Sequence, residues 1–208
     1  MHPMRTLLLF MAAAIGMHSA NAATAVDECP LNLSLRTTPD AFVAKLTSMP
    51  SFRTERTPER KPLFGQCSYQ ASTLQQFAMP PNGLCSIDGQ LTFGSMLEIL
   101  DSESIVVSHT FMMLKSDQSL AALRSALGRI ATSVSPQSDP SAWKTDPYTV
   151  IDGVYAHDGD VWTIFHKVKD PGSVSTAPDF YAVTHVRRDW LDFSRRDLNT
   201  CKEIPSSK

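Results

Sequence analysis

The sequence predicts an α+β fold, with a single domain in which a mostly antiparallel β-sheet of about six or seven strands carries two main helices on one face. Two pairs of β-rich segments are each separated only by an Asp-Gly dipeptide, Asp88-Gly89 and Asp158-Gly159. This is the strongest short-range hairpin signal, because a type I′ turn needs positive φ at both central residues. Two further segments carry apolar residues at helical spacing. Because neighbouring strands are joined by short turns, antiparallel pairing is favoured.

Residues 1–22 have the pattern of a cleaved secretion signal. A short basic start precedes the apolar residues 6–17, and Ala20-Asn21-Ala22 supplies the small-residue pattern of a cleavage site. The apolar run is shorter than the roughly 20 residues that a membrane-spanning helix needs. Cys29 lacks the small-residue context of a lipid-anchored cysteine. We therefore expect residues 23–208 to form a soluble periplasmic or secreted domain with no membrane span or lipid anchor.

The charge of the chain argues against nucleic-acid binding. Removal of residues 1–22 takes away one of the 19 Lys and Arg residues and none of the 21 acidic ones, so the formal charge becomes −3. Nucleic-acid binders usually carry a basic excess instead.

The short, Ala-rich signal favours bacterial export. In a eukaryotic secreted protein, Asn32-Leu33-Ser34 would be a glycosylation acceptor.

Four cysteines in an exported chain predict two disulfides. Three pairings of Cys29, Cys67, Cys85 and Cys201 are possible. We expect Cys67–Cys85 and Cys29–Cys201, because the second bridge would tie both ends of the mature chain to the domain. Closing so long a loop is worth about 4–5 kcal/mol in the loop-entropy description.

The first helix is predicted to begin at Thr38 and to end before Pro50. Thr38 suits the capping position, Pro39 the first helical position and Asp40 the positive end of the helix dipole. The residues expected to be buried are Phe42, Val43 and Leu46.

The second helix is predicted to be capped by Ser116 or Asp117 and to run to Val134. Gly128 weakens it by up to about 1 kcal/mol relative to alanine and suggests close packing at that point. The apolar stripe that would pack on the sheet consists of Leu120, Leu123, Leu127, Ile130 and Val134.

The segments outside these helices are predicted as follows. Residues 51–63, rich in arginine and proline, are expected to form a solvated loop, with a partner-binding loop as the alternative. A short strand should span Leu63–Ala71, and Pro80-Pro81-Asn82-Gly83 should form a turn. Trp143 is expected to cover an edge of the core, and the alternative is an exposed binding residue.

Residues 90–114 are predicted to form a hairpin whose register follows the apolar residues, because a one-residue slip would turn them to water. Centring the turn on Ser102 places His109 across from Ser95, on the apolar face. We therefore expect His109 to be a hydrogen-bonded core histidine rather than a catalytic one. The other expected pairs are Ile99 with Ile105, Leu97 with Val107, Phe93 with Phe111, and Leu91 with Met113.

Residues 148–168 hold the most concentrated group of candidate functional residues. The Asp158-Gly159 turn pairs His157 with Asp160, Ala156 with Val161, Tyr155 with Trp162 and Val154 with Thr163, and opposed residues share a face. The face formed by Val154, Ala156, Val161, Thr163 and Phe165 is predicted to be the core face. The other face is the candidate contact surface, centred on Tyr155 and Trp162, and its candidate binding residues are Tyr155, His157, Asp158, Asp160, Trp162 and His166.

The usual catalytic motifs do not occur in the sequence: there is no G-x-S-x-G, G-x-x-x-x-G-K, H-E-x-x-H or C-x-x-C. His157, His166 and His185 are too widely spaced for a compact zinc site, so we expect no metal and no cofactor. A thiol protease would need an unpaired cysteine, such as Cys85 near His109.

These observations favour a non-enzymatic protein-binding domain over an enzyme. The expected partner is another envelope or secreted protein, and an inhibitor or an immunity protein against an envelope-directed toxin would fit. The alternative is a small periplasmic hydrolase that uses His157 or His166 with Asp158 or Asp160 on the 151–168 hairpin.

Overall fold

The computed structural model describes residues 26–46, 56–63, 67–78, 82–100, 104–135, 148–169 and 179–190. The predictions for the secretion signal, Trp143 and Cys201 lie outside these residues. The elements, in chain order, are α1 (Pro39–Leu46), β1 (Arg56–Leu63), β2 (Cys67–Phe77), β3 (Ser86–Ile87), β4 (Gln90–Leu100), β5 (Ile105–Leu114), α2 (Asp117–Ile130), β6 (Thr132–Val134), β7 (Thr149–His157), β8 (Asp160–Lys167) and β9 (Phe180–Val186).

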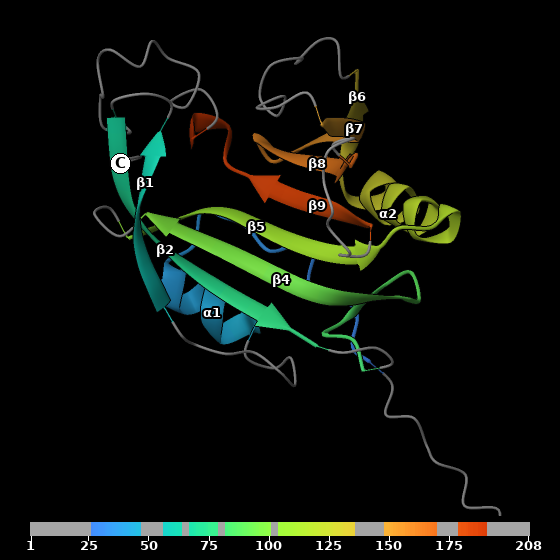
Figure 1. Ribbon diagram of the computed structural model, residues 1–208, viewed down its shortest axis with the longest axis horizontal. Coiled ribbons are helices and arrows are strands. Elements are labelled where there is room, and N and C mark those ends of the chain that lie inside the picture. Colours follow the sequence, from blue (N-terminus) through green and yellow to red (C-terminus); the bar gives the residue numbers. More distant parts are fainter. Residues whose placement is uncertain are drawn as a thin grey trace, which may run out of the picture.

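The strands form one antiparallel sheet with the order β1-β2-β4-β5-β9-β8-β7-β6, and β3 pairs with β4 outside this path. The last strand, β9, lies between β5 and β8 and joins the two groups of hairpins (Figure 1). The predicted β-rich α+β fold with antiparallel pairing is confirmed, and the described sheet has nine strands rather than six or seven. Coverage of a single face by both helices stays a prediction.

The first additional strand is β1, in residues that the sequence predicted to be a solvated loop. It pairs with β2 from Arg56 opposite Leu74 to Leu63 opposite Cys67, so the loop prediction is wrong for residues 56–63. β1 is the edge strand of the sheet, where a proline without an N–H group is tolerated. Proline and charged residues on an edge strand also discourage pairing with other chains. β2 is longer than the predicted Leu63–Ala71 strand and begins at Cys67.

The second helix ends earlier than predicted. Ser116 caps α2 by accepting a hydrogen bond from the Ser119 N–H, and the helix stops at Ile130. The next residues form the edge strand β6, because β-branched Thr132 and Val134 favour extended backbone. Gly128 has open space around it rather than a close neighbour, so the predicted packing role is wrong.

The first helix agrees with its prediction over the described residues. The Thr38 hydroxyl accepts a hydrogen bond from the Ala41 N–H at 3.3 Å, and Pro39 opens α1. Phe42 and Leu46 are buried, and Val43 is half-buried against the same core.

Both predicted Asp-Gly hairpins are present. Asp88 and Gly89 have φ of 47° and 76°, and Asp158 and Gly159 have φ of 46° and 79°. Positive φ at both positions is the type I′ geometry that these dipeptides favour.

The predicted register of β4 and β5 is wrong by two residues in the middle of the hairpin and by one residue at each end. Leu97 faces His109 instead of Val107, and Ser95 faces Phe111. Irregularities between Thr92 and Gly94 and between Glu98 and Ile99 shift the pairing. Such bulges cannot be placed from the alternation of apolar residues, since each inserts one unpaired residue. The shift of two keeps the faces unchanged over the middle of the hairpin, so His109 still lies on the core face.

Alternate residues of the strands belong to two apolar clusters. The larger also contains residues of α1 and α2, and its members include Phe42, Leu97, Phe111, Leu127, Trp162 and Val183. The smaller is formed by Leu100, Val107, Val154, Val161, Val186 and Trp190.

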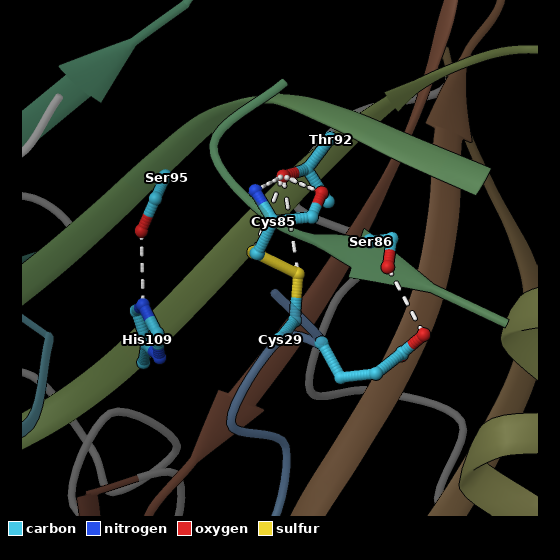
Figure 2. The surroundings of a disulfide bond; sticks show 7 residues. Cys29, Cys85, Ser86, Thr92, Ser95 and His109 are labelled. Carbon is cyan, nitrogen blue, oxygen red and sulfur yellow. Dashed lines mark hydrogen bonds between the residues drawn. A yellow bond between two sulfur atoms is a disulfide. The ribbon is translucent and has the colours of Figure 1, made fainter. Parts of the chain in front are cut away.

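One disulfide joins Cys29 to Cys85 in the described residues, so the predicted pairing of these two cysteines is wrong (Figure 2). The N-terminal segment runs beside β3: Cys29 N–H donates to the Ser86 carbonyl and Ser86 N–H donates to the Asp27 carbonyl. This pairing brings Cys29 to Cys85, and the Thr92 hydroxyl accepts a hydrogen bond from the Cys85 N–H. Cys85 therefore has no free thiol, which removes the thiol-protease alternative.

Among the described residues, no helix has the length and apolar character needed to cross a membrane.

Candidate functional site

The β7–β8 hairpin has the register that the Asp158-Gly159 turn predicted, including the pairs His157 with Asp160 and Tyr155 with Trp162. The middle of its candidate contact face is nevertheless buried. Trp162 is 1% exposed and Tyr155 is 7% exposed, and both belong to the larger core cluster. The interpretation of these two side chains as an exposed contact surface is therefore wrong. The opposite face is also largely buried, since Val154 and Val161 belong to the smaller cluster.

At the turn end of this hairpin, the candidate residues are held by other parts of the chain. Asp160 is 3% exposed and accepts hydrogen bonds from the Arg36 guanidinium at 2.9 Å and from the Arg188 N–H at 3.3 Å. Burial raises the pKa of Asp160, and the positive charge of Arg36 opposes that rise. This carboxylate therefore fixes the N-terminal segment and the residues that follow β9 to the hairpin.

His157 is also engaged at the turn end. Its Nδ1 lies 2.7 Å from the carbonyl oxygen of Ile130, at the end of α2, so Nδ1 carries the proton and donates it. Its Nε2 lies 3.6 Å from the exposed Asp158 carboxylate. The contacts of His157 join the hairpin to α2, and they are those of a structural residue.

Two further histidines lie in the core next to this hairpin. His185 stacks on Trp162 with ring centroids 4.4 Å apart, and His109 faces His185 across β5 and β9. Burial lowers the pKa of both histidines to about 3. His109 is hydrogen-bonded to the Ser95 hydroxyl at 2.9 Å, as Figure 2 shows, which confirms its predicted role as a core histidine.

His166, at the open end of the hairpin, has a different environment. The pairing of β7 with β8 is interrupted between Ile151 and Gly153, which leaves Asp152 as an extra residue in β7. The Asp152 carboxylate lies 2.6 Å from Nδ1 of His166. Gly153 is needed beside it, because a Cβ there would lie 3.0 Å from the ring of Tyr155. The bulge therefore aims a carboxylate at the histidine.

The tautomer of His166 follows from this contact. An ionised carboxylate can only accept a hydrogen bond, so Nδ1 carries the proton, and in the neutral imidazole Nε2 keeps its lone pair. Among the described residues Nε2 has no hydrogen-bond partner, and the His166 side chain is 10% exposed. A carboxylate that orients a histidine in this way is the arrangement of a general base.

Apolar side chains and two cations lie around His166. Val150 is its cross-strand neighbour on β7 and Tyr181 its neighbour on β9, with the His166 and Tyr181 rings edge to face at 5.5 Å. Tyr148 and Val168 follow on the same face, joined by a 2.8 Å backbone hydrogen bond. Tyr148, Val150 and Val168 are each 37–43% exposed and are called the valine-tyrosine group below. Lys115 lies over the Tyr181 ring at 5.8 Å, and Arg124 donates to the Asp152 carbonyl at 3.0 Å.

A second group of exposed apolar residues lies on the opposite face of the sheet, at the same end. We call it the aromatic patch and define it as Phe77, Phe93, Met112, Leu114 and Phe180. Register places Phe77, Gly94 and Met112 in one cross-strand row and Leu114 beside Phe180. The rings of Phe93 and Phe180 meet edge to face at 5.9 Å. Phe77 is 58% exposed and Leu114 is 45% exposed.

Gly94 forms the floor of the aromatic patch. A Cβ at this position would lie 3.1 Å from the Met112 methyl group and 3.2 Å from the Phe77 ring. The glycine therefore lets two large side chains close over the strand. Because Phe111 and Met113 alternate with Met112 and Leu114 along β5, they point into the core on the other face.

The candidate residues that the sequence predicted do not lie together in the β7–β8 hairpin. His157, Asp158 and Asp160 lie at the turn end, Tyr155 and Trp162 in the core, and His166 at the open end. Sequence reasoning missed Asp152, although the Asp152-Gly153 dipeptide was a signal for a bulge. No group of three or more His, Cys, Asp or Glu side chains is arranged for a metal ion within the described ranges.

Comparisons with protein-family models, with curated proteins and with solved structures found no match.

Proposed function

We propose that the chain is an exported protein-binding domain and that the aromatic patch is its contact surface. The partner would be another envelope or secreted protein, as for an inhibitor or for an immunity protein that neutralises an envelope-directed toxin or enzyme. The observation that carries the proposal is the exposure of Phe77 and Leu114 beside three half-buried apolar side chains. Aromatic residues and methionine are enriched in the centres of protein interfaces.

Two further observations support this proposal. A cross-strand glycine at position 94 is what allows the patch to pack tightly while Phe77 stays exposed, so the patch is preorganised by the sheet. The Cys29–Cys85 disulfide is typical of oxidising compartments and supports export.

The experiment compares three forms of the tagged mature protein recovered from the native envelope fraction: wild type, a patch variant and a control. The patch variant is Phe77→Ser with Leu114→Ser. The control is Thr132→Ser with Ser133→Ala on the exposed strand β6. Wild type and control should each bring down the same stoichiometric protein, and the patch variant should recover at least about tenfold less, since loss of two central apolar contacts costs more than about 1.4 kcal/mol.

The patch variant must also keep its fold, which circular dichroism checks. Both altered side chains are largely exposed, so the free energy of unfolding should change by less than about 1 kcal/mol for each substitution. Equal recovery of the partner by the folded patch variant, or recovery of no partner by wild type, would count against the proposal.

The two acids that the sequence offered for the hydrolase alternative lie at the turn end of the hairpin. Asp160 binds Arg36, and Asp158 lies at the turn beside His157. Neither is the partner of His166, whose carboxylate is Asp152. Of the pairs that the sequence offered, His157 and Asp158 lie 3.6 Å apart.

A further inference from the structure

The Asp152–His166 pair combines three features that packing alone does not require. The 2.6 Å contact orients the imidazole, the second ring nitrogen has no partner among the described residues, and the valine-tyrosine group lies exposed beside it. A purely structural histidine is usually satisfied at both nitrogens or turned into the core. His109, which is 1% exposed and bonded to Ser95, is an example in this chain.

We propose that His166 is a general base and that the site takes an ester of an apolar carboxylic acid. The acyl chain would lie along the valine-tyrosine group, because this is the exposed apolar surface next to the imidazole. Asp152 is a positioning residue: it keeps the proton on Nδ1 so that Nε2 can accept one. This activity is separate from the proposed binding function, which rests on the opposite face of the sheet.

The step balances with water as the only co-reactant. Nε2 of His166 takes a proton from a water molecule, and the water oxygen forms a bond to the ester carbonyl carbon. The bond between that carbon and the alcohol oxygen then breaks, and the alcohol oxygen takes the proton back from Nε2. The products are a carboxylic acid and an alcohol, and His166 returns to its neutral form. No oxidation or reduction occurs.

Positive charge near His166 would favour this step. Lys115 lies over Tyr181, the β9 neighbour of His166, and Arg124 donates to the Asp152 carbonyl from α2. Negative charge that develops on the carbonyl oxygen is stabilised by nearby cations. Lys115 lies on the β9 side of His166, and Arg124 lies on the β7 side.

The test uses p-nitrophenyl butyrate and p-nitrophenyl acetate as probes on the mature protein. The variants are His166→Gln, Asp152→Asn and Val150→Ser. The control is His157→Gln, which removes the other histidine of this hairpin that lies near a carboxylate. Circular dichroism and urea unfolding verify that each variant is folded before the rate is measured.

Wild type and His157→Gln should hydrolyse the butyrate ester faster than buffer, and His166→Gln should lower kcat at least about 100-fold, the usual contribution of a general base. Asp152→Asn should lower kcat with little change in KM, a split that loss of structure alone would not produce. Val150→Ser should reduce the preference for butyrate over acetate. A wild-type rate equal to buffer, or an unchanged rate in folded His166→Gln, would overturn the proposal.

Discussion

The two ends of the β7–β8 hairpin each hold a histidine close to an aspartate, yet their environments differ. At the turn end, Asp160 is bound by Arg36 and by the backbone of Arg188, and His157 is bound to the end of α2. At the open end, Asp152 binds only one nitrogen of His166, and the surrounding apolar side chains are exposed. The same residue types therefore serve the fold at one end and remain available for chemistry at the other.

The difference teaches that a His–Asp pair is informative only together with its remaining hydrogen-bonding capacity. At the turn end, the buried carboxylate is satisfied by protein donors, as buried polar groups generally are. At the open end, the aromatic patch on one face and the valine-tyrosine group on the other place exposed apolar side chains near the same edge. Substitutions in the middle and at the turn end of the hairpin should therefore affect stability, and substitutions at the open end should affect function.

The largest expected effect is on the buried middle of the hairpin. Trp162→Ala should lower the free energy of unfolding by about 3–5 kcal/mol, because it removes a side chain that is 1% exposed and leaves a cavity. Val168→Ala, at the open end and 43% exposed, should cost less than about 1 kcal/mol. Urea unfolding at neutral pH measures both. A similar loss of free energy of unfolding in the two variants would contradict the difference between the buried middle and the open end of the hairpin.

Acid should destabilise the protein through the two core histidines. Burial lowers the pKa of His109 and His185 from 6.5 to about 3, so between these values the unfolded chain binds more protons than the folded one. The free energy of unfolding is therefore highest well above pH 6.5. It falls as the pH decreases, by about 2 kcal/mol for each histidine at pH 5. Asp160 works in the opposite direction, because burial raises its pKa.

Urea unfolding curves between pH 7.5 and 5 would measure this loss. The midpoint should move to lower urea concentration as the pH falls below 6.5. A midpoint that stays constant over this interval would show that the two imidazoles are not buried in their neutral form.

A smaller effect compares the ion pairs at the two ends. Arg36→Ala leaves the carboxylate of Asp160 buried with only the Arg188 N–H, so it should cost about 1–3 kcal/mol and raise the pKa of Asp160 further. Lys169→Ala breaks the pair with Asp179, in which both side chains are more than half exposed, and should cost less than about 0.5 kcal/mol. Equal unfolding midpoints for the two variants would contradict the structural role assigned to the turn end.

Much of the local structure could be predicted from the sequence where short-range chemistry determines it. The two Asp-Gly turns, the caps of Thr38 and Ser116 and the register of the β7–β8 hairpin are all confirmed. In each case, two to four neighbouring residues set the geometry. The class of the fold follows from these hairpins and from the apolar periodicity of the helices.

Features that depend on distant residues could not be predicted. The partner of Cys29 is set by the pairing of the N-terminal segment with β3, and the bulges in β4 and β5 shift a register that alternation alone suggested. Trp162 was assigned to the wrong surface because both faces of β8 are buried, so alternation along the strand gives no contrast. The aromatic patch combines three strands that are neighbours in the chain, β2, β4 and β5, with the distant strand β9, which only the sheet order brings beside β5.

The central claim is that the open end of the sheet makes the contacts and the turn end supports the fold. Its most direct test is site-specific photocross-linking with p-benzoylphenylalanine placed at position 77 in one protein and at position 158 in another, since both side chains are exposed. After irradiation in the native envelope, position 77 should form a covalent adduct with one protein and position 158 should form none. An adduct at position 158 with none at position 77 would contradict the account.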